Sequence, residues 1–279
     1  MTALLWESRS ESFDFQILKM NFIKTSSIII SFFFIIVGCS DEQDASFIDP
    51  DKILNYQPLG SAASDLLNDD FYEKLTIEIV SVDGFEPSEK AIAGFSDFVS
   101  EHLNKPKGIE IIQRNVPASG IQHFDIKQST RLENLYRTRY TKDDEITVYI
   151  YFADGYQASD HQSAFTLGTS YHNTSIIIYE KTLKELSQKV NAPQLSTLEN
   201  AALNHEFGHL LGLVNTEDAS ITNGDLTSKN LDHTGHCDSK GCLMQAAIPF
   251  GTKIMEVMGQ GVPLLDEKCL KELTRKRGF

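Results

Sequence analysis

Two histidines and a glutamate stand close together in the segment NHEFGHLLGLVN, residues 204–215. His205 and His209 are four residues apart, so on an α-helix they project from one face, with Cβ atoms about 5–6 Å apart. Two imidazoles in this arrangement can bind one zinc ion at Zn–N distances of about 2.0–2.1 Å. Glu206 lies beside the first histidine, where its carboxylate would hold a water molecule rather than the metal. The motif predicts a hydrolase in which a zinc-bound water attacks a carbonyl carbon. Glu206 activates that water by taking its proton.

The motif supplies only two of the three protein ligands that a catalytic zinc ion usually has. Three residues after Gly212 stands Asn215, whose neutral amide is a poor zinc ligand. Further along, the segment LDHTGHCDSKGCLMQ, residues 231–245, contains His233 and His236. The third ligand is therefore expected in this later segment.

The helix that must carry the motif is predicted for STLENAALNHEFGHLLGLV, residues 196–214. Ser196 and Glu199 have the spacing of a capping box at its start. Gly212 is expected to end the helix, because glycine adopts a left-handed backbone without steric cost.

The rest of the chain predicts strands and helices that alternate before this helix. The expected strands are 74–84, 108–117, 145–155, 163–174 and 175–183, and the other expected helices are 87–103, 129–140 and 266–277. The run 145–155 is expected to be the central strand, and a short helical turn is expected within 61–70. This order indicates an α+β (α/β-like) fold with a mixed, twisted sheet.

Composition limits the classes of partner. The chain has 279 residues, a formal net charge of −14 and a sequence pI of about 5.0. Nucleic-acid phosphates require clustered Lys and Arg, so we do not expect a nucleic-acid partner.

The N-terminal region has the pattern of an export signal. An apolar run, 28–37, follows Met20 and Lys24 and is too short to cross a bilayer, which takes roughly 20 apolar residues. It ends in Ile-Val-Gly-Cys, similar to a bacterial lipobox, so we expect Cys39 to carry lipid; the alternative is an N-terminal membrane anchor helix. The predicted organisation is a signal segment 1–38 with its true start at Met20, a lipidated and polar tether 39–70, and a catalytic domain 71–279. The acidic run after Cys39 resembles a lipoprotein surface-export signal; the alternative is the solvated charge of a linker. With the lipobox, we expect the cell envelope, at the outer membrane or cell surface.

HEFGHLLG and HCDSKGCLM together resemble the archaemetzincin branch of the metzincin zinc proteases. The pattern of that branch is HExxHxxGxxH, followed by Cys, four residues, Cys, one residue and Met. Here the third histidine is displaced from position 215 to position 236, by 236 − 215 = 21 residues. The resemblance implies zinc ligation by His205, His209 and His236, with His233 as the alternative third ligand. It also implies that Glu206 is the general base.

The same resemblance implies the surroundings of the metal. Met244 would be the methionine of a turn beneath the metal, within a small irregular C-terminal subdomain. The edge strand that pairs with an extended peptide substrate would contain Gly168, Thr169, Ser170 and Tyr171. With the lipobox, these features resemble membrane-anchored metalloproteases of Gram-negative envelopes.

The remaining cysteines allow two arrangements. In an exported protein Cys237 and Cys242 can form a disulfide, which leaves Cys269 free and partly buried. The alternative is a second metal site, for which the family uses further cysteines in a CxxC pair, whereas this chain has only Cys269 downstream. We therefore expect a disulfide and one catalytic Zn²⁺ ion.

The long segment between Gly212 and His236 is expected to form a lid or rim of the substrate cleft. It contains Asp218, Asp225 and Asp232, but their spacing matches no EF-hand loop, so we do not expect calcium.

Three functions are consistent with these patterns. The first is a zinc-dependent peptidase that acts on peptide or protein substrates and is held to a membrane by N-terminal lipid. The second is a zinc-bearing but non-catalytic envelope lipoprotein that binds peptides along the edge strand. The third is a metal-free envelope scaffold. Retention of Glu206 favours the first, because a purely structural zinc site has no need of that carboxylate.

Overall fold

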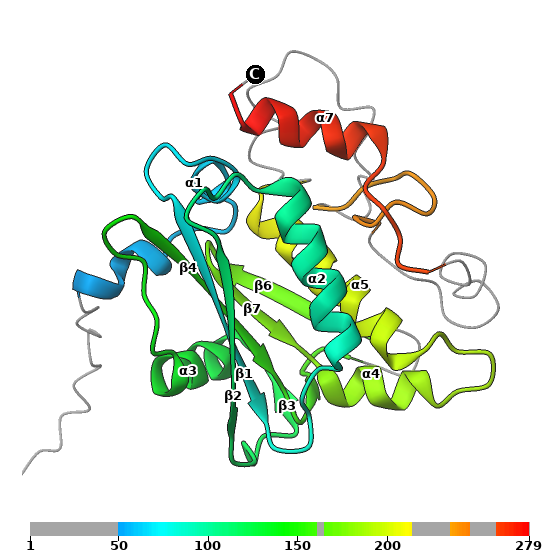
Figure 1. The fold of residues 1–279 in the computed structure, drawn as a ribbon. Coiled ribbons are helices and arrows are strands. Elements are labelled where there is room, and N and C mark those ends of the chain that lie inside the picture. Colours follow the sequence, from blue (N-terminus) through cyan, green and yellow to red (C-terminus); the bar gives the residue numbers. More distant parts are fainter. Residues whose placement is uncertain (1–49, 161–164, 214–234, 246–260, 279) are drawn as a thin grey trace, which may run out of the picture. The chain divides into compact units, whose positions relative to one another are not determined.

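A five-stranded mixed sheet forms the centre of the structure, a computed structural model that describes residues 50–160, 165–213, 235–245 and 261–278 (Figure 1). The strand order is β2-β1-β4-β7-β6; the first four strands run parallel and β6 is antiparallel to β7. The strands are β1 (Lys74–Val82), β2 (Ile109–Val116), β4 (Glu145–Phe152), β6 (Gly168–His172) and β7 (Ser175–Ile178). The predicted mixed sheet is confirmed, with β4 as its central strand.

The described helices lie before, between and after the strands along the chain. They are the 3₁₀ helix η1 (Pro50–Asn55), α1 (Ala63–Leu67), α2 (Glu89–His102), α3 (Ile126–Tyr136), α4 (Glu180–Ser187), α5 (Leu195–Leu210) and α7 (Glu267–Lys276). A small parallel pair joins β3 (His123–Phe124) and β5 (Tyr156–Gln157).

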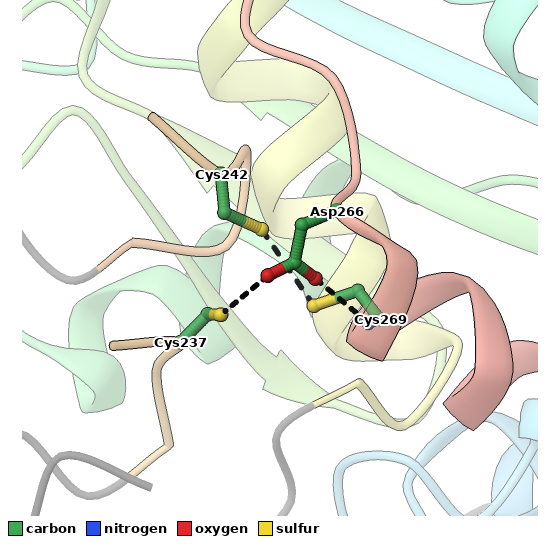
Figure 2. Close-up of side chains that lie close together, drawn as sticks. All are labelled: Cys237, Cys242, Asp266 and Cys269. Carbon is green, nitrogen blue, oxygen red and sulfur yellow. Dashed lines mark hydrogen bonds between the residues drawn. The ribbon is translucent and has the colours of Figure 1, made fainter. Parts of the chain in front are cut away.

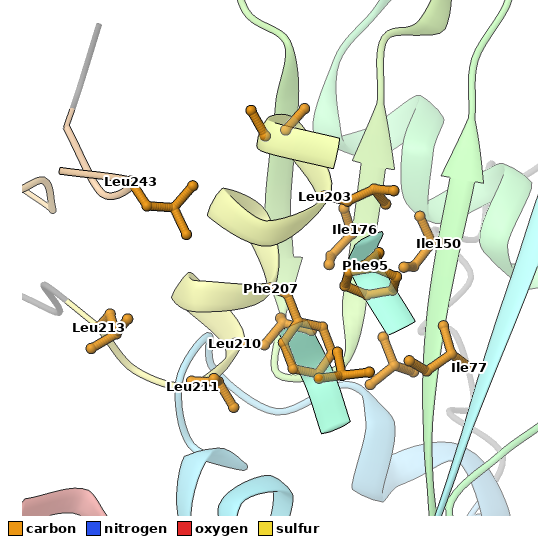
Figure 3. Packing of buried hydrophobic residues seen from close by; sticks show 14 of the residues in the cluster. Ile77, Phe95, Ile150, Ile176, Leu203, Phe207, Leu210, Leu211, Leu213 and Leu243 are labelled. Carbon is orange, nitrogen blue, oxygen red and sulfur yellow. The ribbon is translucent and has the colours of Figure 1, made fainter. Parts of the chain in front are cut away.

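Successive side chains of a strand point to opposite faces of the sheet. Both faces are buried, because a hydrophobic cluster packs against each of them. On one face, Ile77 of β1 packs in a cluster with Phe95 of α2 and Phe207 of α5 (Figure 3). The two phenylalanine rings meet edge to face, with centroids 5.5 Å apart. On the other face, Val80 of β1 packs with Leu132 of α3. Helix α5 is therefore held against the sheet by its own apolar residues.

The two ends of α5 differ in how well the sequence predicted them. The predicted capping box is wrong: the N-cap is Gln194, without a side-chain cap, and Glu199 is a buried residue of the helix. The Glu199 carboxylate instead accepts hydrogen bonds from the backbone nitrogen and the hydroxyl of Ser88, the N-cap of α2. It thus ties α5 to the start of α2.

The C-terminal end of α5 was predicted correctly. Gly212 has a φ of +74°. Its amide donates to the carbonyl of His209 over 2.9 Å, and the amide of Leu213 donates to that of Gly208 over 3.0 Å. This is a Schellman motif, which satisfies carbonyls that the end of a helix would leave without partners.

Three sequence expectations need correction. Strand 175–183 ends at Ile178, and the residues that follow form helix α4. The helix expected at 129–140 is α3, which begins and ends earlier, at Ile126 and Tyr136. Residues 50–70 of the expected tether are packed: Leu66 and Leu67 are fully buried.

The N-terminal part of the described chain is also tied to the sheet by polar contacts. The Asn55 amide nitrogen donates to the carbonyl of Thr147 over 3.2 Å, and its oxygen accepts from the amide of Thr141 over 2.9 Å. The Lys105 ammonium donates to the carbonyls of Asp65 and Tyr72, at 2.7 and 2.6 Å. None of the helices within the described ranges has the length and apolar character of a membrane span. The expected signal segment 1–38 and residues 39–49, Cys39 included, lie outside these ranges.

Candidate metal centres

Three histidines converge at the C-terminal half of α5. His205 and His209 come from adjacent turns of the helix, and His236 comes from the segment 235–245. One ring nitrogen of each lies within 4.8 Å of the other two. Tetrahedral zinc with N–Zn bonds of about 2.0–2.1 Å would place two ligand nitrogens about 3.3 Å apart. The Nε2 atoms of His205 and His209 are 3.2 Å apart, so the donor set fits a zinc ion.

The tautomer of His205 is fixed by the same segment that carries His236. Its Nδ1 lies 2.7 Å from the carbonyl oxygen of Leu243. Because a carbonyl only accepts, Nδ1 must carry the hydrogen, which leaves the lone pair on Nε2, toward His209. In metal sites, a hydrogen bond from the ring nitrogen that does not bind the metal orients the imidazole, and the bond from Nδ1 to the Leu243 carbonyl would do so here.

His209 is held in the form that binds metals. Burial lowers its pKa well below the usual value, and the neighbouring rings of His205 and His236 lower it further. A hydrogen bond to the backbone of Leu213 opposes this shift in part. The neutral imidazole is the ligand form, so the centre favours ligation over protonation.

Glu206, a residue of α5, is buried, with 7% of its surface exposed. Its side chain points toward the edge strand β6, where it contacts Ser170. Burial raises the pKa of Glu206, while the His205 ring and a hydrogen bond from Ser170 lower it. Its backbone carbonyl and Oε2 both lie near the Ser170 hydroxyl, at 2.8 and 2.9 Å. The carboxylate thus has a defined position next to the histidines.

Met244 packs directly under the helix, between the turns that carry the two histidines. It is fully buried. A Cβ built on Gly208 would lie 2.5 Å from the Met244 sulfur, so only glycine allows this approach. Met244 therefore lies against the helix, and its role as the methionine of a turn beneath the metal stays a prediction.

The strand proposed for substrate binding lies at an edge of the sheet. β6 contains Gly168, Thr169, Ser170 and Tyr171, and among the described residues it pairs with β7 on one side only. Its position beside α5 brings the edge that these residues leave open next to the histidine centre. Pairing with a substrate there remains a prediction.

His233, the alternative third ligand, lies outside the described residues. So do Asn215, which was not expected to bind zinc, and Asp218, Asp225 and Asp232, which were not expected to bind calcium. The expected lid or rim, residues 213–235, lies outside them too, apart from Leu213 and Gly235.

Figure 2 shows a second cluster of metal-binding side chains, one of which, Cys237, directly follows His236 in the sequence. Cys237 and Cys242 come from the segment 235–245, and Asp266 and Cys269 come from the start of α7. All three thiols are free and buried, so the expected Cys237–Cys242 disulfide is not formed, and Cys269 is more deeply buried than expected.

The distances in this cluster fit a tetrahedral zinc ion better than a disulfide. The Cys242 and Cys269 sulfurs are 3.7 Å apart, far beyond the roughly 2.05 Å of an S–S bond. Two thiolates on tetrahedral zinc, each about 2.3 Å from the metal, would be about 3.8 Å apart. Cys237 Sγ lies 3.5 Å from Asp266 Oδ2, and the corresponding sulfur–oxygen separation around zinc is about 3.6 Å.

The charge state of the cluster also fits a cation. Hydrogen bonds with the Cys242 thiol and, to a smaller extent, with the Cys269 thiol lower the pKa of Cys237. The same contact with Cys237 is the main reason that the pKa values of Cys242 and Cys269 are raised. One thiolate therefore forms readily, whereas ionising all three beside a carboxylate requires a neutralising cation.

Asp266 is the site residue that sequence reasoning missed. Its Oδ1 accepts from the backbone amide of Cys269 over 2.8 Å and caps α7, which leaves Oδ2 for the cluster. The search for a second site considered only sulfur ligands, although zinc also accepts Asp oxygens. An acidic residue three positions before Cys269 was the available signal. The contact of Ser170 with Glu206 and the role of the Leu243 carbonyl were also missed.

No family model matches the sequence, and no curated protein matches it. Among solved structures, the chain is similar to archaemetzincin from Methanopyrus kandleri, with 17% identity, a TM-score of 0.46, and coverage of 74% of this chain and 97% of that one. It is also similar to metalloproteinase-II from Bacteroides fragilis, with 13% identity, a TM-score of 0.42, and coverage of 82% of this chain and 58% of that one.

Proposed function

We propose that this protein is a metzincin-like, zinc-dependent peptidase, with His205, His209 and His236 as the ligands of the catalytic zinc ion. The observation that carries the proposal is the convergence of three imidazole nitrogens within 4.8 Å, beside the buried carboxylate of Glu206. Three nitrogen ligands leave one tetrahedral position open, which distinguishes catalytic zinc sites from structural ones.

Zinc in this centre would supply Lewis acidity, which lowers the pKa of water and stabilises negative charge on a carbonyl oxygen. Glu206 would then act as the general base. Its carboxylate takes a proton from the attacking water and donates it to the nitrogen of the departing peptide. The raised pKa of this buried carboxyl group suits a residue that must both accept and return a proton.

The substrate would bind as an extra strand along the open edge of β6, Gly168–His172. Backbone hydrogen bonds to an exposed strand edge hold an extended peptide without requiring a particular sequence. Because Ser170 of this strand contacts Glu206, a peptide bound there would run past the general base.

The test compares the wild-type protein with Glu206→Gln. We expect both to hold zinc in the histidine centre and only the wild type to cleave a broad peptide library. Zinc bound by both with cleavage by neither would support the peptide-binding lipoprotein instead. Wild-type protein purified with far less than one zinc ion per chain, and unable to take zinc up, would contradict both.

We further propose that the second cluster holds a structural zinc ion through Cys237, Cys242, Asp266 and Cys269. Four protein ligands close the coordination shell, which is typical of sites that stabilise a fold rather than catalyse. This cluster would join the segment 235–245 to α7. The proposal replaces the expected single ion with two per chain, which metal analysis of the purified protein would count.

The cell-envelope location is proposed from the sequence alone. Lipid on Cys39 would hold the catalytic domain at a membrane of the envelope. Labelling with a fatty acid should mark the wild type, and Cys39→Ser should lose both the label and the membrane association. Retention of both in the variant would exclude acylation at this cysteine.

A further inference from the structure

The edge strand and the general base are joined by one side chain. The Ser170 hydroxyl lies 2.9 Å from Glu206 Oε2 and 2.8 Å from the Glu206 backbone oxygen. A hydroxyl has one hydrogen to donate, so the two acceptors compete for it or share it. Both acceptors belong to one residue, so in either case the serine holds Glu206 against β6.

The same strand makes room for that carboxylate. A Cβ on Gly168 would lie 2.6 Å from Glu206 Cγ and 3.1 Å from its Cδ. Gly168 and Ser170 are two positions apart, so they face the same side of the strand. Thr169 faces the other side, where its hydroxyl lies 3.4 Å from that of Tyr179. On the face of β6 toward α5, Gly168 thus leaves a notch for the carboxylate, and Ser170, two residues further on, offers a hydrogen-bond donor.

We propose that Ser170 is a positioning residue that fixes the Glu206 carboxylate for proton transfer, with Gly168 as the notch that admits it. The inference rests on the proposed peptidase function. Ser170 distinguishes the two carboxylate oxygens: Oε2 is tied to the strand, and Oε1 is assigned to the proton. Because the substrate would pair with the same strand, peptide register and base orientation are set by one element.

The first experiment is kinetic. Ser170→Ala should lower kcat by roughly tenfold to a hundredfold, as expected for a displaced catalytic group, with KM little changed. Ser170→Thr, which keeps the hydroxyl, should recover part of the lost kcat. The matched control is Ser187→Ala in α4, which also removes a serine hydroxyl that donates to a backbone carbonyl, that of Lys184, and it should leave kcat near the wild-type value. An unchanged kcat in Ser170→Ala, in an active wild-type background, would overturn the inference.

The second experiment does not depend on activity. Unfolding of the wild type, Ser170→Ala, Glu206→Ala and the double variant is measured after removal of metal with a chelator. If the serine holds the carboxylate, Ser170→Ala should destabilise the wild type more than the Glu206→Ala background, in which only the backbone carbonyl of residue 206 remains as an acceptor. Equal effects in both backgrounds would overturn the contact. If the wild type cleaves no peptide, the peptidase proposal fails, and this cycle still decides whether Ser170 holds Glu206.

Discussion

The backbone amide of Cys237 donates a hydrogen bond to the carbonyl oxygen of Met244 over 2.7 Å. This contact closes the segment 235–245, which carries parts of both candidate metal centres. His236 and the Leu243 carbonyl belong to the histidine centre, while the thiols of Cys237 and Cys242 belong to the other. The two centres are therefore expected to depend on each other through one short segment.

The third ligand is tested by His236→Ala and Asn215→Ala. We expect His236→Ala to lose most of the zinc of the histidine centre and all measurable peptidase activity, because two ligands bind zinc far more weakly than three. Asn215→Ala should keep both. Zinc content by mass spectrometry, measured with peptide cleavage, checks this. The reverse pattern would show that the displaced histidine is not the ligand.

The second centre is tested by Asp266→Asn. Asparagine caps a helix as well as aspartate, so α7 should persist while the charged ligand is lost. We expect the zinc content to fall from two ions per chain toward one. The matched control is Asp238→Asn, a surface residue 3.4 Å from Lys268. A ratio of two ions per chain in Asp266→Asn would remove this residue from the ligand set.

Packing beneath the histidines is tested by Gly208→Ala. The new Cβ would lie 2.5 Å from the Met244 sulfur, so the methionine or the helix must move. We expect destabilisation of about 1–3 kcal/mol, the usual cost of overpacking a core. The double variant with Met244→Ala should show a smaller added cost from the glycine change. Chemical denaturation measures both, and a fully additive double variant would argue against this contact.

A pH dependence is expected from Glu180 at the start of α4. Burial, and then the neighbouring charge of Glu199, raise the pKa of Glu180 from 4.5 to about 9, with Lys184 opposing and Glu86 adding to the shift. Between these two values the unfolded chain is ionised and the folded chain is protonated. Unfolding therefore releases a proton, and stability falls as pH rises, by at most about 1.4 kcal/mol per pH unit.

Glu180→Gln should remove the loss of stability at high pH, because glutamine has no proton to release on unfolding. We expect the variant to gain stability relative to the wild type as pH rises from 5.5 to 8.5, measured by urea unfolding at several pH values. Glu185→Gln, an exposed position of the same helix, is the control. Parallel stability curves for Glu180→Gln and the wild type would show that the folded protein does not hold this proton.

The sequence predicted the features that depend on local patterns. The apolar run 145–155 identified the central strand, and Gly212 identified the end of α5, because each signal acts within a few residues. The histidine pair was visible for the same reason, since one turn of helix fixes its geometry. His236 was reached only through a motif, because nothing local shows that the chain returns to α5.

The misses involve partners distant in sequence. Ser196 and Glu199 have capping-box spacing, but Glu199 bonds to Ser88, which lies far upstream. The disulfide was preferred because cysteines were considered alone, whereas Asp266 reaches the cluster from a helix near the C-terminus. Helix α4 was read as part of a strand because the continuous apolar run before it hides where the strand ends.

The contacts of Met244 and Leu243, together with α7, hold segment 235–245 in place. The position of His236 therefore does not depend on how many residues separate it from Gly212. We therefore expect the histidine centre to tolerate a change in the number of residues between these two points. Foreign sequence could then be inserted there to retune which substrates reach the centre while the donor atoms stay where they are.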